Sequence, residues 1–127
     1  MKDRTVRTRT VTVELDDDGI LNVFPLPGIT QGADDARENL EACRKLLGGR
    51  SGLVLVDLRT GGILDRGART VYAEEAAEFT LAQAMLVDSA FARITANLFI
   101  RVASPRQITR MFTDKAEAVR WLKEYGA

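Results

Sequence analysis

Histidine is absent from the 127-residue sequence, and cysteine occurs once, at Cys43. Without histidine the chain lacks the usual general base and the usual zinc ligand, and one cysteine excludes an internal disulfide and a multi-cysteine metal site. No apolar run approaches the ~18 residues of a membrane span, and the first ten residues contain no apolar core of a secretion signal. We therefore expect a cytoplasmic protein without a metal or a cofactor.

An excess of charge of one sign is also lacking, because 18 basic residues balance 18 acidic ones. With 46% apolar and 28% charged residues the composition is that of an ordinary globular protein, and the length suits a single domain over residues 1–127. Segment 1–9 carries four basic residues that could attract nucleic acid or acidic lipid. We favour an edge strand there, because alternating Arg and Thr protects a sheet edge, and we expect no nucleic-acid partner.

The chain divides into strands, which show alternating polar and apolar residues or short apolar runs, and helices, which show apolar residues at helical spacing. Strands are expected at 4–15, 20–26, 52–58, 80–87 and 107–112, and helices at 33–47, 66–79, 90–102 and from 114 onward. A turn at 16–19 makes the first two strands an antiparallel hairpin, and the strand–helix–strand units that follow favour right-handed parallel crossovers. The sequence predicts an α/β fold, a five-stranded mixed sheet with four helices in the order ββαβαβαβα.

A local motif supports this fold. In residues 53–68, LVLVDLRTGGILDRGA, an apolar strand ends in Asp57-Leu58, and Asp65 follows eight residues after Asp57. The motif resembles the STAS domain (SpoIIAA-like fold), where such a strand ends in Asp-Leu and a loop leads to Asp-Ser-Ser-Gly at a helix start. The C-terminal half is similar to small bacterial proteins of the STAS/SEC14-like group in its residues Ser89, Arg93, Asn97, Phe112–Asp114 and Trp121-Leu122. The resemblance covers about residues 10–125.

The resemblance implies a regulatory module that is switched by phosphorylation of a serine in Asp-Ser-Ser-Gly. Here the stretch 65–68 reads Asp-Arg-Gly-Ala and carries no hydroxyl group. Thr60 and Thr70 lie nearby, but neither occupies the matching place. We therefore expect a module that lacks the phosphorylatable serine, and a kinase directed at STAS domains should leave residues 65–68 unmodified.

The loop after strand 52–58 is the main candidate binding site, because ligands of open α/β sheets gather at the C-terminal ends of the strands. The candidate residues are Asp57, Arg59, Thr60, Asp65, Arg66 and Arg69. The arginines could bind an anion or a partner's carboxylate, and we expect Arg59→Ala and Arg66→Ala to weaken binding but to change stability by under ~0.5 kcal/mol. A purely structural interpretation stays open, in which Asp65 caps a helix and the arginines are solvated.

Helix 90–102 carries a second candidate surface. Arg93, Asn97 and Arg101 are spaced by four and therefore share one face. No acidic residue occurs between Asp88 and Asp114, a segment that holds four arginines. A solvated helix face is the favoured interpretation, because the patch is small for a nucleic-acid binder. Arg93 and Asn97 remain candidate partner-binding residues.

These features favour a non-enzymatic STAS-like regulatory or protein-interaction module that binds an unidentified protein through residues 57–69. We also expect a homodimer through an exposed helix face or through the long strand 5–14, whose edge is otherwise unpaired. The alternative is a small-molecule or lipid carrier of SEC14-like type, with an apolar or anionic ligand at the strand ends. An apolar pocket above about 300 Å³ would favour the carrier. An enzyme is least favoured, because neither a base nor a metal cluster is found.

Overall fold

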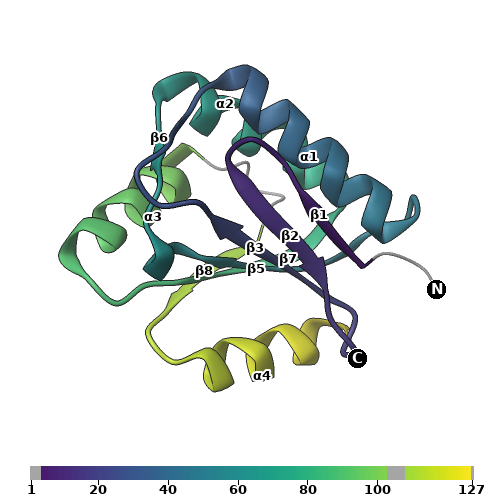
Figure 1. Ribbon diagram of the computed structural model, residues 1–127. Coiled ribbons are helices and arrows are strands. Elements are labelled where there is room, and N and C mark those ends of the chain that lie inside the picture. The colour runs from purple at the N-terminus through teal and green to yellow at the C-terminus, as the bar shows by residue number, and fades with distance from the viewer. Residues whose placement is uncertain (1–3, 103–107, 127) are drawn as a thin grey trace.

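The computed structural model describes residues 4–102 and 108–126 (Figure 1). One mixed sheet has the strand order β1-β2-β3-β5-β7-β8. The bounds of these strands are Thr5–Arg7, Val11–Leu15, Ile20–Pro25, Gly52–Asp57, Thr80–Leu86 and Thr109–Phe112. β1, β2 and β3 pair antiparallel, whereas β3, β5, β7 and β8 are parallel. The C-terminal ends of four strands therefore meet at one edge.

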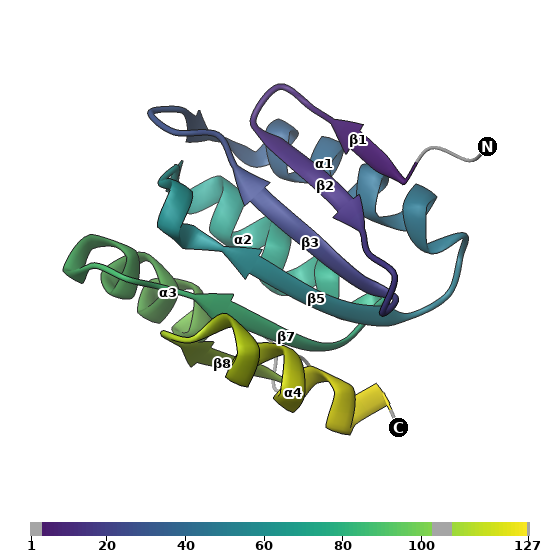
Figure 2. The same ribbon diagram turned by 60° about the horizontal axis from the view of Figure 1, so that its bottom comes forward.

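Helices cover the two faces of the sheet unequally (Figures 1 and 2). The helices α1 (Ala33–Leu47), α2 (Arg66–Glu75) and α3 (Ala90–Val102) pack on one face, and α4 (Lys115–Gly126) packs alone on the other. Two short 3-10 turns, η1 (Leu58–Thr60) and η2 (Ala76–Glu78), follow β5 and α2. None of the helices within the described ranges has the length and hydrophobicity that a bilayer crossing requires.

The α/β class, the mixed sheet and the four helices agree with the prediction, but the main sheet has six strands where five were expected, and the order of elements along the chain differs accordingly. The stretch expected as one strand over 4–15 folds back on itself, so β1 pairs with β2 and the sheet has six strands. The Thr8 hydroxyl accepts hydrogen bonds from the backbone N–H of Thr10 and of Val11, at 3.3 and 3.1 Å. A side chain thus stabilises this turn, and no Gly or Pro marks it in the sequence.

A second small sheet joins two loops that the sequence analysis left without structure. β4 (Thr30–Gln31) and β6 (Ile63–Leu64) are parallel, and they lead directly into α1 and α2. The backbone N–H of Asp65 donates to the carbonyl of Gln31 at 3.0 Å. This pairing holds the start of α2 beside the start of α1, and it fixes the outer part of the loop between β5 and α2.

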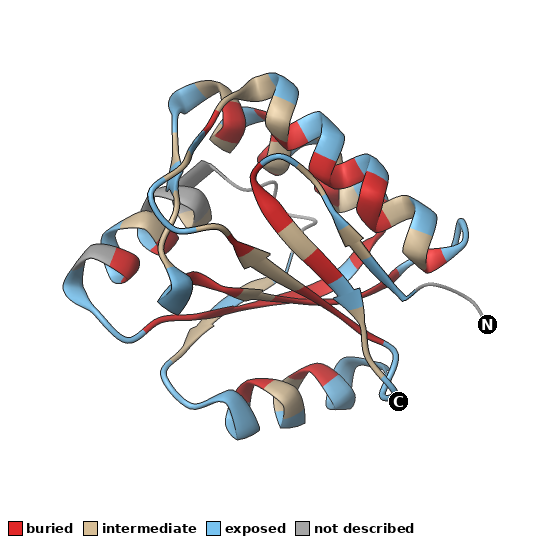
Figure 3. Cartoon of the chain, in the orientation of Figure 1, coloured by how far each residue is buried: buried red, intermediate tan, exposed pale blue. Residues whose placement is uncertain are grey.

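The central strand β5 is buried on both sides, as its continuous apolar run predicted (Figure 3). Leu53 and Leu55 pack toward α4, whereas Val54 and Val56 pack toward α1 and α2. The stripe of α1 is also buried as predicted, and it includes Cys43. Burial raises the pKa of the Cys43 thiol to about 12. The thiol therefore stays protonated at neutral pH and serves as packing.

Candidate functional site

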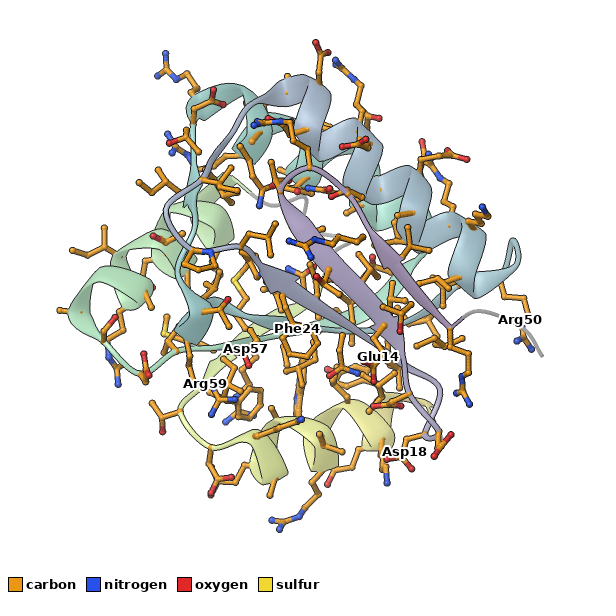
Figure 4. The ribbon with its side chains drawn as sticks, in the orientation of Figure 1. Glu14, Asp18, Phe24, Arg50, Asp57 and Arg59 are labelled. Atoms are coloured by element: carbon orange, nitrogen blue, oxygen red, sulfur yellow. The ribbon has the colours of Figure 1, made fainter. Side chains whose placement is uncertain are left out.

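Asp57 ends β5 at the edge where the parallel strands terminate, and Arg59 lies beside it (Figure 4). The Arg59 backbone N–H and Nε both donate to Oδ1 at 3.0 Å, and Arg59 Nη2 donates to Oδ2 at 2.9 Å. Only 9% of the Asp57 side chain is exposed. The carboxylate thus caps η1 and forms an ion pair with a guanidinium group two residues further on.

Both members of this pair are charged at neutral pH. Burial alone would raise the pKa of Asp57, but the hydrogen bonds from the Arg59 side chain and backbone outweigh burial, so the pKa lies below its usual value. The hydrogen bond to Asp57 raises the pKa of Arg59. The Arg59 side chain is 39% exposed, and a guanidinium has five N–H donors. Arg59 can therefore still donate to an outside acceptor while it holds Asp57.

The loop that follows is attached to the end of β3. The Thr60 hydroxyl donates to the Pro25 carbonyl at 2.6 Å and approaches the Asp57 carbonyl at 3.1 Å. Gly61 and Gly62 have φ angles of +99° and +92°, a region that favours glycine. A Cβ at Gly62 would lie 2.8 Å from the Cβ of Pro25. The loop path therefore depends on a small residue at Gly62 and on the Thr60 hydroxyl.

The start of α2 uses two of the predicted site residues for its own structure. The Asp65 carboxylate accepts from the backbone N–H of Ala68 at 2.9 Å, so Asp65 is an N-cap. Arg69 Nη1 donates to the Leu64 carbonyl at 2.8 Å. Arg66 is exposed, and no ion pair is found for it within the part of the chain that the structure describes. Arg66 is thus available to a partner, whereas Asp65 and Arg69 stabilise the loop.

The predicted residues of α3 lie near the same sheet edge. Arg93 and Asn97 are both exposed, one turn apart, on a helix that contacts α2 and η1. The Ser89 hydroxyl accepts from the backbone N–H of Ala92 at 3.1 Å, so Ser89 caps this helix. The Arg101 side chain, the third member of the predicted row, lies outside the described side chains, as does Arg106.

Two large apolar side chains are exposed at this edge, although the helical spacing of Ile94 predicts that it belongs to the buried stripe of its helix. Ile63 in β6 is 44% exposed and Ile94 in the first half of α3 is 59% exposed. β6 and the first turns of α3 both lie where β5 and β7 end (Figure 1). We define the strand-end surface as the exposed side chains of Arg59, Ile63, Arg66, Arg93, Ile94 and Asn97.

Sequence analysis missed a buried polar cluster behind this edge. Asn39 Nδ2 lies at 2.8–3.1 Å from hydrogen-bond acceptors on Thr10, Gln31 and Tyr72. The Thr8 hydroxyl donates to Asn39 Oδ1 at 2.5 Å, and the Tyr72 hydroxyl donates to Gln31 Oε1. Burial raises the pKa of Tyr72. One signal was present, because Asn39 falls between Ala36 and Cys43 on the apolar stripe of its helix.

Beside this cluster is a cavity of about 70 Å³ between the sheet and α1, α2 and α3. A shallower groove of about 290 Å³ lies at the opposite edge, between residues such as Leu15, Leu47 and Leu81. Within residues 4–102 and 108–126, no group of three or more Cys, Asp or Glu side chains is arranged to hold a metal ion. The predicted strand-end site is therefore a surface formed by loops and helix starts.

Residues 13–126 match the family model described as a domain of unknown function, DUF7793. The chain belongs to this family. Among solved structures, the DUF7793 domain is similar to an uncharacterized protein of the DUF3478 family with a SpoIIAA-like fold from Shewanella loihica PV-4. The identity is 16%, the match covers 88% of this chain and 91% of that chain, and the TM-score is 0.61. It is also similar to a protein of unknown function from Arthrobacter sp. FB24, with 30% identity over 94% of this chain and 98% of that chain and a TM-score of 0.35.

The likeness to the Shewanella protein confirms the SpoIIAA-like fold that the STAS resemblance implied. At 16% identity it shows the fold alone. No curated protein matches the sequence significantly, and no enzymatic family is indicated for the DUF7793 domain.

Proposed function

We propose that this DUF7793 domain is a non-enzymatic, STAS-like interaction module that binds a protein partner through the strand-end surface. The observation that carries the proposal is the exposure of Ile63 and Ile94, 44% and 59%, at an edge that also presents exposed arginines. Protein interfaces combine apolar side chains with Arg at their centre, and they contain few acidic residues there. We infer a partner surface with an apolar pocket and with carboxylate or carbonyl acceptors.

The internal bonding of the loop supports this proposal. The Asp57–Arg59 pair, the Thr60–Pro25 hydrogen bond and the Asp65 cap hold residues 57–68 in one conformation. A surface that is ordered before binding loses less conformational entropy when a partner docks. The module would therefore bind through a preformed surface, without a phosphorylated serine at residues 65–68.

The size of the cavity favours the module over a lipid carrier. Pockets for drug-sized ligands measure about 300–1,000 Å³, whereas the cavity behind the strand ends has about 70 Å³. The other hollow, of about 290 Å³, is a shallow groove at the N-terminal ends of the strands, away from the predicted carrier site. The cavity at the strand ends is therefore too small for a lipid chain.

The expected homodimer stays a prediction, but the strand edge available to it is shorter than expected. β1 covers the edge of β2, and the new edge is only three residues long, with exposed Thr5 and Arg7. A dimer would use this short edge or an exposed helix face. Light scattering at high protein concentration should give a dimeric mass, and a strictly monomeric mass would exclude the dimer.

Site-specific photo-crosslinking tests the proposed partner site. A photoreactive phenylalanine analogue replaces Ile63 or Ile94 in the full chain, and the same analogue at Leu81 is the matched control. Leu81 is also apolar and 50% exposed, but it lies near the start of β7, at the opposite edge. The chain is expressed in its native host cells, and crosslinked products are identified by mass spectrometry.

We expect one discrete crosslinked protein from positions 63 and 94 and none from position 81. The double variant Arg66→Glu, Arg93→Glu should abolish this product without a change in melting temperature. The proposal is overturned if the products from position 81 are the same, or if positions 63 and 94 give none.

A further inference from the structure

The cavity between the sheet and the three helices α1, α2 and α3 is largely apolar. Its walls include Val23, Val54, Val56 and Met85 from the strands and Leu40 and Phe79 from the helix side. No charged residue belongs to the lining among the described residues. Transfer of a charge into such surroundings is unfavourable without a partner. A molecule bound there would therefore be uncharged.

One polar side chain in this cavity has an unused donor. Gln83 lies in the middle of β7, and its neighbours Ala82 and Ala84 pack against α4 on the other face. The Gln83 residue is only 5% exposed and lines the cavity. Its side-chain Nε2 has no hydrogen-bond partner in the described part of the structure. Most buried polar groups are paired, because an unpaired one is unfavourable.

Three other polar side chains of the cavity wall are paired within the protein. Gln31, Asn39 and Tyr72 bind one another in the buried polar cluster. The backbone N–H of Gln83 also has a partner, since it donates to the Ile108 carbonyl at 2.8 Å. Among the buried side-chain nitrogen and oxygen atoms of the described residues, Gln83 Nε2 is the one without a hydrogen-bond partner. Its complement is one acceptor atom on an otherwise apolar molecule.

We propose that this cavity binds a small uncharged ligand, mainly apolar, whose one oxygen accepts a hydrogen bond from Gln83 Nε2. The volume of about 70 Å³ is less than half of the about 150 Å³ that holds benzene, so a ligand of only a few non-hydrogen atoms fits. Small ketones, alcohols and amides have this size and chemistry. The site is internal, and it goes beyond the proposed interaction surface because it would persist if no protein partner existed.

The test uses nitrogen-15-labelled full-length protein, titrated with propanone and followed by amide NMR spectra. Propanone has the proposed size and one acceptor oxygen. We expect saturable shifts of the Gln83 side-chain NH₂ signals and of the backbone amides of Val56 and Met85. The matched apolar probe is 2-methylpropene, which has the same shape without the oxygen. It should bind at least about tenfold more weakly, because it leaves the amide unpaired.

The variant Gln83→Met keeps an unbranched side chain of similar length and removes the donor. It should lose propanone affinity by at least about tenfold, and it should melt no lower than the wild type, because an unpaired buried amide is removed. Leu81→Met, on the same strand and outside the cavity, should bind propanone as the wild type does. Gln83→Leu is the second variant if Gln83→Met does not fold.

Two results would overturn the proposal. NMR shifts that rise linearly with propanone concentration without saturation, or that affect amides over the protein surface, mean that propanone does not enter the cavity and that the cavity admits water only. Equal propanone affinity in the wild type and in Gln83→Met means that the amide does not select the ligand.

Discussion

The Arg59→Ala variant should destabilise the protein, against the expectation that a loop arginine is structurally neutral. Asp57 is buried, and within the described part of the chain its three N–H donors come from Arg59, two of them from the guanidinium group. Alanine keeps the backbone N–H but removes two donors and the counter-charge. Loss of one partner from a buried ion pair costs about 3–5 kcal/mol. Because the Arg59 side chain is 39% exposed, solvent screening reduces the expected loss to about 2 kcal/mol.

The pH dependence of this loss has a definite sign. In the wild type, the pKa of Asp57 is lowered, against the effect of burial, by the hydrogen bonds from Arg59, and Lys115 adds a smaller effect in the same direction. The contribution of Asp57 to the free energy of unfolding is therefore present above about pH 4 and is lost as pH falls through the lowered value. In the variant, burial acts on a carboxylate without its arginine. The pKa of Asp57 should move upward, so its charged form should destabilise the fold near neutral pH.

The difference in unfolding free energy between wild type and variant should thus be largest near pH 7 and should shrink as the pH approaches about 3.5. Urea denaturation, followed by the fluorescence of Trp121, measures this difference. Arg66→Ala is the matched control, because Arg66 is exposed in the same loop region, and it should stay within about 0.5 kcal/mol of wild type. The double variant Asp57→Asn, Arg59→Ala should recover part of the loss. Wild-type stability of Arg59→Ala, or a loss that does not change with pH, would refute this reasoning.

Two further substitutions test the loop and the interior. Gly62→Ala should lower the free energy of unfolding by about 2 kcal/mol, because φ is +92° and the new Cβ would lie 2.8 Å from Pro25. Its melting temperature should fall further than that of Gly28→Ala, where φ is +74° but no atom lies within 4 Å of the new Cβ. Equal decreases in melting temperature would contradict the role of the Pro25 contact. Asn39→Leu should lower the free energy of unfolding by about 3 kcal/mol, because it leaves buried acceptors such as the Tyr72 hydroxyl without the Asn39 donor. Urea denaturation measures this change, and a decrease below about 1 kcal/mol would contradict the reasoning.

The elements that could be predicted from sequence are those that local pattern determines. The apolar run of β5 and the stripe of α1 each follow from residues close together in the chain, and so do the caps Asp65 and Ser89. The break between β1 and β2 was beyond such reasoning. Alternating Thr and Val suit a continuous strand as well as a hairpin, and the Thr8 hydroxyl that stabilises the turn has no distinctive spacing.

The buried polar cluster shows why the interior could not be predicted. Its members come from the β1–β2 turn, β4, α1 and α2, and each is an ordinary polar residue within its own segment. Only the packing of α1 against α2 and the pairing of β4 with β6 bring them together. The same holds for Gln83, which is one polar residue in an apolar strand until a cavity is found beside it.

The bonding within the loop also ranks the residues that a partner could use. The side chains of Asp57, Thr60 and Asp65 form hydrogen bonds that hold the loop itself. Their replacement would therefore change the shape of the surface rather than remove a direct contact with a partner. Ile63 and Ile94 have no such role and are exposed by 44% and 59%. Truncation of an apolar residue at the centre of an interface can cost about 2 kcal/mol or more in binding, whereas an exposed one contributes little to folding. Partner affinity should therefore depend on the two isoleucines more than on the acidic residues that first identified the loop.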